Sequence, residues 1–84
     1  MITEKQNHII NVLENEGLEV DGSQEYYIVQ DSEGHNITLE FVEDYYTKIL
    51  DNDLRTRTVS LDQEHLLLTE VLDALDYNFE EVSL

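Results

Sequence analysis

Carboxylates are the side chains through which this chain could do chemistry, because it carries 20 Asp and Glu against four Lys and Arg. Paired carboxylates can transfer protons, ligate hard cations, or present negative charge to a basic partner. With 20 carboxylates in 84 residues, some close pairs arise by chance, so pairing alone does not indicate catalysis. Whether the carboxylates serve catalysis, metal binding or a basic partner depends on the Ser, Cys and His residues that accompany them.

Motifs for catalysis are missing from the sequence. It contains no nucleophile elbow, no Gly-rich phosphate loop and no metalloprotease helix. The chain has no Cys, which excludes a thiolate nucleophile, a cysteine-based zinc site and a disulfide framework. The serines fit turns, caps or the chain end more simply than a catalytic triad. We therefore expect a protein that is not an enzyme and uses no cofactor.

Metal binding is also not indicated. The run Asp51-Asn52-Asp53 looks like the start of a calcium loop. A loop counted from Asp51 would, however, place Arg55 and Thr56 where an oxygen ligand and the sharp-turn Gly belong. The histidines lie far apart in the sequence, without paired ligand spacing, at His8, His35 and His65. The sequence predicts no specific metal site.

The net charge of −16 is the property that most needs a physical reason. A compact state with this charge repels itself, so the composition costs folding stability. Nucleic acid and anionic membranes would repel the chain, which argues against direct binding to either. A basic nucleic-acid-binding protein is the partner that the charge favours. We expect an acidic inhibitor of the DNA-mimic type, phage-encoded, acting against a nuclease, a CRISPR effector, a restriction or repair enzyme, or a regulator.

The candidate partner-binding residues fall into three groups along the chain. Acids near a helix C-terminus oppose the helix dipole, so Glu14 and Glu16 are not placed for local stability. The first group, near the end of a first helix, is Glu14, Glu16, Glu19 and Asp21. The second, near the far end of a sheet, is Glu40, Glu43 and Asp44. The third, along a last helix, is Glu70, Asp73, Asp76 and Glu80.

The negative charge also fits two further classes of protein. An immunity protein or antitoxin would neutralise a basic toxin through the same electrostatics. A small structural or regulatory subunit would use the charge for solubility and an open sheet face to form a homodimer or larger oligomer. Ordinary solvation and halophilic adaptation would produce a similar composition. The N-terminus has no secretory pattern and no stretch has membrane-spanning length, so we expect a cytoplasmic protein.

A first helix is predicted over about residues 4 to 16. Thr3 and Gln6 have the spacing of a capping box. Apolar residues then recur at helical spacing, ending at Leu13. Gly17 can adopt the left-handed conformation that ends a helix, and Leu18 can then contact Leu13 in a Schellman motif.

Strands are predicted next. Residues 18 to 21 alternate as a short strand, and Asp21-Gly22-Ser23 has turn chemistry before the β-prone run at 26 to 29. The segment 31 to 34 forms a polar hairpin loop with Gly late in it, followed by an alternating strand at 37 to 41. Adjacent tyrosines on a strand should point to opposite faces, at Tyr26 and Tyr27 and at Tyr45 and Tyr46.

Residues 44 to 59 fit either a short helix or a strand. Ser60 and Gln63 suggest a second capping box and a terminal helix over about 61 to 77, whose apolar face contains Leu61, Leu67, Leu68, Val71, Leu72, Leu75 and Phe79. We expect a single domain over residues 1 to 84, of α+β class. It should have an antiparallel sheet of three to four strands, with the N-terminal and C-terminal helices packed on one face.

Overall fold

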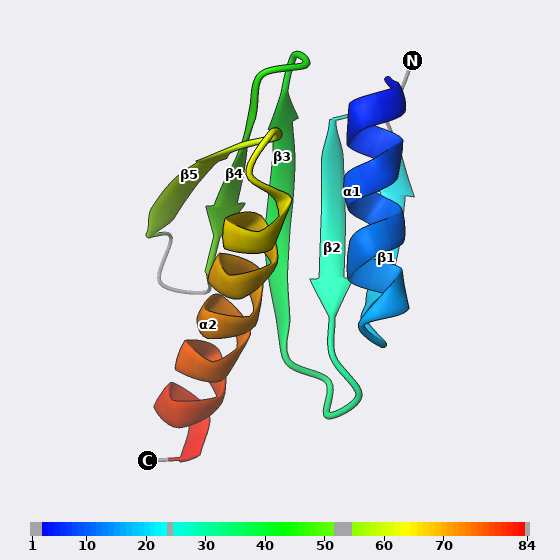
Figure 1. Ribbon diagram of the computed structural model, residues 1–84. Coiled ribbons are helices and arrows are strands. Elements are labelled where there is room, and N and C mark those ends of the chain that lie inside the picture. Colours follow the sequence, from blue (N-terminus) through cyan, green and yellow to red (C-terminus); the bar gives the residue numbers. More distant parts are fainter. Residues whose placement is uncertain (1–2, 24, 52–54, 84) are drawn as a thin grey trace.

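The computed structural model describes residues 3–23, 25–51 and 55–83, with side chains in these ranges except at Ser23 and 77–83. The elements are α1 (Glu4–Asn15), β1 (Glu19–Ser23), β2 (Tyr26–Gln30), β3 (Asn36–Val42), β4 (Tyr46–Leu50), β5 (Thr56–Ser60) and α2 (Glu64–Ser83). The strands form one antiparallel sheet in chain order (Figure 1). The α+β class is confirmed, but the sheet has five strands instead of three to four.

Helix α1 forms as the sequence predicts. The Thr3 hydroxyl accepts a hydrogen bond from the Gln6 N–H at 3.2 Å, and the Gln6 side chain accepts one from the Thr3 N–H at 3.0 Å. At the other end, the Gly17 N–H donates to the Glu14 carbonyl and the Leu18 N–H to the Leu13 carbonyl. These are the two hydrogen bonds of a Schellman motif, and Gly17 has the positive φ that the motif requires, +89°.

Strand β1 extends through the segment for which a turn was predicted. Gly22 lies opposite Tyr27 in the β1–β2 ladder, with a φ of +152°. A Cβ atom at this position would lie 2.2 Å from the Tyr26 carbonyl oxygen. Gly22 therefore serves a close approach of two strands and not a chain reversal, which is why the predicted turn was wrong.

The hairpin between β2 and β3 agrees with the prediction. The Asp31 carboxylate accepts hydrogen bonds from the N–H groups of Glu33 and His35, each at 2.9 Å. Gly34 takes a φ of +90° near the end of the loop. Side-chain hydrogen bonds from Asp31 thus organise this loop in the manner typical of Asx turns.

The ambiguous segment 44 to 59 contains two strands, and no helix among its described residues. An inward-facing polar residue obscures the alternation in each strand. In β4, Thr47 is fully buried and its hydroxyl donates to the Glu40 carbonyl at 2.8 Å. In β5, Arg57 lies opposite the buried Ile49 in the ladder. A polar residue at an inward position removes the period-2 signal from which a strand is recognised.

Helix α2 begins three residues later than predicted and ends six residues beyond residue 77. Ser60 ends β5, and its hydroxyl accepts from the Asp62 N–H in a turn at 3.2 Å. The predicted capping box is therefore absent, and the Gln63 carbonyl accepts the first helical hydrogen bond, from Leu67. Leu72, predicted on the apolar face, is 39% exposed. The predicted face residue Phe79 lies outside the described side chains.

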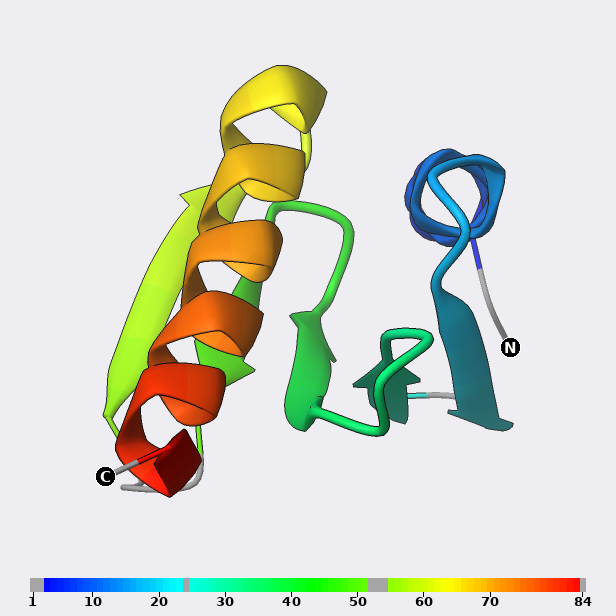
Figure 2. The same ribbon diagram turned by 90° about the horizontal axis from the view of Figure 1, so that it is seen from below.

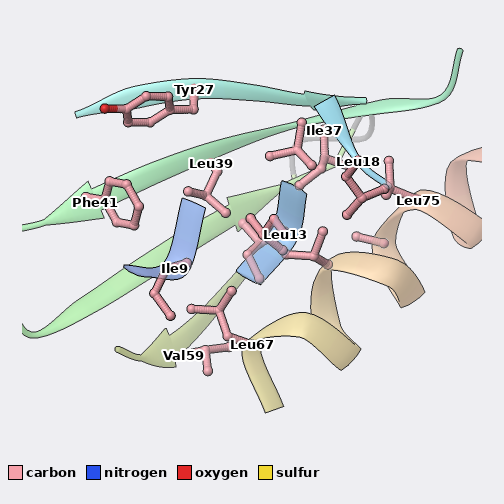
Figure 3. Packing of buried hydrophobic residues seen from close by; sticks show 14 of the residues in the cluster. Ile9, Leu13, Leu18, Tyr27, Ile37, Leu39, Phe41, Val59, Leu67 and Leu75 are labelled. Atoms are coloured by element: carbon pink, nitrogen blue, oxygen red, sulfur yellow. The ribbon is translucent and has the colours of Figure 1, made fainter. Parts of the chain in front are cut away.

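Both helices cover the same face of the sheet, as predicted. Helix α1 packs on β1 and helix α2 on β3, β4 and β5, and the helices contact each other (Figure 2). The core fills the space between these layers with residues from both helices and from β2 to β5 (Figure 3). Among them, the Tyr27 and Phe41 rings pack edge to face at 5.5 Å between centroids.

On the opposite face of the sheet, no helix of the described residues covers the strands. Side chains alternate across each strand, so residues next to the buried positions point to this outer side. Tyr26 and Ile28 are exposed whereas Tyr27 and Val29 are buried. We call this side the open face; it carries Glu19, Asp21, Tyr26, Ile28, Gln30, Asn36, Thr38, Glu40, Val42, Tyr46, Lys48, Leu50, Thr56, Thr58 and Ser60.

Candidate acidic interface

Three of the four Lys and Arg side chains form ion pairs with acids of the same chain. Lys5 pairs with Asp62 at 3.1 Å and Arg55 with the buried Asp51 at 3.1 Å. Lys48 lies directly opposite Glu40 in the β3–β4 ladder. Among the described residues Lys48 forms no ion pair, whereas the other three cations are engaged within the molecule.

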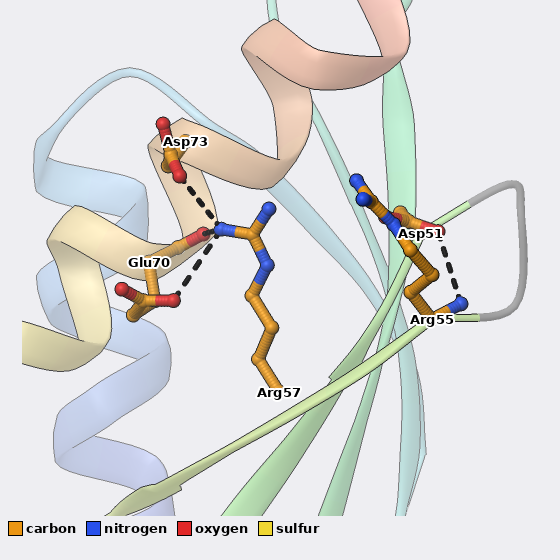
Figure 4. Close-up of polar contacts among 5 residues, drawn as sticks. All are labelled: Asp51, Arg55, Arg57, Glu70 and Asp73. Carbon is orange, nitrogen blue, oxygen red and sulfur yellow. Dashed lines mark hydrogen bonds and ion pairs between the residues drawn. The ribbon is translucent and has the colours of Figure 1, made fainter.

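Arg57 makes the most extensive of these contacts. One of its terminal nitrogens lies 2.9 Å from the Asp73 carboxylate and 3.3 Å from that of Glu70, and it also reaches the Glu70 carbonyl at 3.4 Å (Figure 4). The contact joins the sheet to helix α2. Both arginines therefore pair with acids of the same chain.

One group of acids gathers at the end of the molecule where both helices terminate. Neither helix has a basic residue in its last turn that would offset the negative end of its own dipole. The β2–β3 hairpin lies at the same end (Figure 1). Together with Gly17, acids from β1 and the hairpin line a hollow of about 480 Å³. We call the acids in and beside it the hairpin-end cluster: Glu14, Glu16, Glu19, Asp31 and Glu33.

His35 is the basic partner of this cluster among the described residues. Its Nδ1 lies 3.0 Å from Asp31 and 3.8 Å from Glu33. Burial alone would raise the pKa of Asp31. Hydrogen bonds from the His35 side chain and from the His35 and Glu33 N–H groups outweigh it and lower that pKa. In the part of the chain that the structure describes, Glu14, Glu16 and Glu19 form no ion pair.

A second group surrounds a groove at the opposite end, beside the β3–β4 turn. The groove has a volume of about 740 Å³. The Thr3 hydroxyl donates to Asp44 at 2.6 Å, and the Gln6 amide donates to the Glu43 carbonyl, so α1 holds this turn in place. We call it the turn-end groove; it is lined by Lys5, Glu43, Asp44, Tyr45, Tyr46, Thr58, Ser60 and Asp62.

The predicted residues therefore do not form one surface. Asp21 and Glu40 lie on the open face, and Glu40 faces Lys48 there instead of joining the turn acids as predicted. Glu70 and Asp73 are bound by Arg57, while Asp76 is exposed. Glu80 lies in helix α2, but its side chain is outside the described part.

Tyrosine orientation follows the prediction at one of the two pairs. Tyr27 is buried and Tyr26 exposed, as expected on a strand. Tyr45 and Tyr46 are both exposed, because Tyr45 lies in the turn before β4 begins. Both rings line the turn-end groove. The predicted alternation was wrong at this second pair.

Asp51, the first residue of the calcium-like run, has a structural role. Its carboxylate is almost fully buried and accepts hydrogen bonds from the Arg55 N–H and Nε, each at 3.1 Å. Asn52 and Asp53 lie outside the described residues. Within the described ranges, no three acidic or histidine side chains are grouped as a metal site requires.

Raising the salt concentration is expected to stabilise this fold. Because most carboxylates lack a cation, repulsion outweighs the few ion pairs, and screening weakens repulsion between exposed charges. Between about 10 mM and 1 M NaCl the Debye length falls from about 30 to 3 Å. A gain of about 1 kcal/mol would raise Tm by roughly 4–8 °C for a domain of this size. Thermal unfolding followed by circular dichroism measures this. A fall in Tm would show that attraction dominates.

Sequence reasoning missed Asp31, Glu33 and Asp62 as neighbours of the predicted acids. Asp31 and Glu33 were recognisable as loop residues, but only the fold brings their hairpin beside the end of α1.

No helix among the described residues combines the length and apolar character needed to cross a membrane. No protein-family model, curated protein or solved structure matches the chain.

Proposed function

We propose that this chain is a non-enzymatic inhibitor that binds a basic nucleic-acid-binding protein at the surface used for phosphates. The engagement of three of the four cations, Lys5, Arg55 and Arg57, in ion pairs with acids of the same chain is the observation that carries the proposal. The negative charge of the remaining acids is therefore displayed without local compensation. A binding surface built from Lys and Arg to match the charge density of a duplex would attract such a protein over long range.

The sheet side of the molecule supports this role better than helix α2. On α2, Arg57 offsets part of the charge of Glu70 and Asp73. On the sheet side, Glu19 and Asp21 in β1 and Glu43 in the β3–β4 turn form no ion pair within the described residues. An uncompensated carboxylate contributes more to attraction of a basic surface than one already paired.

Displacement of DNA is the direct test. A labelled duplex is bound to each member of a panel of purified proteins: a restriction endonuclease, a CRISPR effector complex, a repair glycosylase, a nuclease toxin and a histone-like protein. The chain should displace the duplex from at least one of them, and its apparent affinity should fall steeply as NaCl increases. Displacement from none of them, even in dilute buffer, contradicts the proposal. Displacement from the toxin alone favours an immunity protein or antitoxin.

Two charge-matched variants identify which acids act. One changes Glu19→Gln, Asp21→Asn and Glu43→Gln, and the other changes Glu70→Gln, Asp73→Asn and Asp76→Asn. Each removes three charges. We expect the first to weaken displacement by about tenfold and the second by less, because Arg57 already compensates part of the α2 charge. Equal losses would show that only net charge matters.

A further inference from the structure

The open face carries exposed apolar side chains, which the attraction between opposite charges does not account for. Six large hydrophobic side chains are exposed in the described structure. Three of them, Tyr26, Ile28 and Tyr46, lie on the open face, and Tyr45 borders it in the adjoining turn. Val42 and Leu50 on the same face are partly exposed. Exposed apolar residues gathered on one side of a small protein indicate a contact surface.

A hollow of about 410 Å³ on this side of the molecule is lined by residues of β1, β2 and β3. Asp21, Gly22, Tyr26, Ile28 and Thr38 contribute to it. In the β1–β2 ladder Asp21 lies opposite Ile28, so an acid and an exposed aliphatic side chain are neighbours at this hollow. A hollow next to exposed aromatic and aliphatic side chains can receive an apolar anchor from a partner.

Acids border the apolar residues of the open face along the β1 edge and at the β3–β4 turn. Glu19 and Asp21 lie along the β1 edge, Glu25 precedes β2, and Glu43 and Asp44 lie in the β3–β4 turn. The centre carries one acid and one base, Glu40 and Lys48, opposite each other. A second copy of this chain would bring two such acidic rims together, and each chain already carries −16. The charge complements a basic occupant and opposes self-association.

We propose that the open face is the docking surface, and that its occupant is a basic protein surface with apolar side chains projecting between its cations. This rests on the function proposed above and adds the surface and the partner's chemistry. The acids at the margin of the face steer the partner, and the exposed apolar side chains of β2 and β4 supply contacts that phosphates cannot make. Specific protein complexes usually combine such apolar contacts with polar groups around them.

Two synthetic peptides of equal length test the proposal without a known partner. In one, arginine alternates with leucine; in the other, arginine alternates with serine. The leucine peptide should bind about tenfold or more tightly than the serine peptide, because both carry the same charge but only one has apolar anchors. Amide NMR shifts on binding should map to the outer-facing positions of β2, β3 and β4.

A matched pair of variants separates the open face from exposed apolar residues elsewhere. Ile28→Thr with Tyr46→Thr keeps β-prone residues, whereas Leu66→Gln changes a 43% exposed side chain on α2. The double variant should weaken binding of the leucine peptide by about tenfold and that of the serine peptide by less than about twofold. Leu66→Gln should alter neither. Thermal unfolding confirms that each variant is folded.

Several results would overturn the proposal. Equal binding of both peptides, shifts confined to the exposed edges of β1 and β5, or equal effects of the two variants would each exclude the open face as the docking surface. Sedimentation showing a dimer that the double variant dissociates would assign the face to a second copy. Peptide binding at the open face with no displacement of DNA in the panel would leave the docking surface standing and reject the proposed inhibitor function.

Discussion

Replacing Gly22 by alanine is expected to destabilise the protein by about 2–4 kcal/mol, through strain at its φ and overpacking against β2. The new Cβ would lie 2.2 Å from the Tyr26 carbonyl oxygen and 2.8 Å from the Tyr27 Cα. Both are backbone atoms of the neighbouring strand, so a side-chain rotation cannot relieve the clash. Urea unfolding followed by circular dichroism measures the loss.

Gly17→Ala is the matched control for this variant. Gly17 also has a positive φ, at +89°, but an added Cβ would meet nothing within 4 Å. Only the cost of the left-handed conformation applies there, about 1–2 kcal/mol. The difference between the two variants therefore isolates the clash between β1 and β2. Equal losses would mean that β1 shifts away from β2 at little cost.

Reversing the charge of Arg57 is expected to cost about 2–4 kcal/mol of stability. Arg57→Glu would remove the bonds to Glu70 and Asp73 and place a third carboxylate under helix α2. The Arg57 side chain is only 22% exposed, so water screens this repulsion incompletely. Urea unfolding at pH 7 gives the free energy of unfolding of each protein.

Lys48→Glu provides the control, because it makes the same change in charge on the open face. It should cost under about 1 kcal/mol, the usual size for like charges on opposite strands. Adding Glu70→Arg to Arg57→Glu should restore much of the stability by exchanging the partners. If Arg57→Glu is no worse than Lys48→Glu, the contact does not hold α2 against the sheet.

The parts of the fold that depend on local chemistry were predictable from the sequence. Helix α1 was one, since capping and Schellman residues act within a few positions of each other. The 31 to 34 hairpin loop was another. Residues 44 to 59 stayed ambiguous between helix and strand. Thr47 and Arg57 occupy inward positions there for reasons that only the tertiary structure supplies: a buried carbonyl partner for Thr47 and an acidic helix over Arg57.

The candidate site was less predictable than the fold. The sequence shows how many acids there are, but not which ones a cation reaches. Glu70 and Asp73 looked equivalent to Asp76, yet Arg57 contacts only the first two in the described structure. The open face could be expected from two helices sharing one side of a sheet. The apolar side chains exposed on it depended on strand register, which fixes the side to which Ile28 and Tyr46 point.

Each strand of the sheet pairs with the strand next to it in the chain, in the order β1 to β5. Each pairing therefore closes only a short loop, and little entropy is lost before contacts form. Chains with such local connectivity reach the native state faster than those that must join distant segments. Newly synthesised chains would accordingly expose their apolar segments only briefly. Repulsion between the negative charges of partly folded chains would also oppose their aggregation.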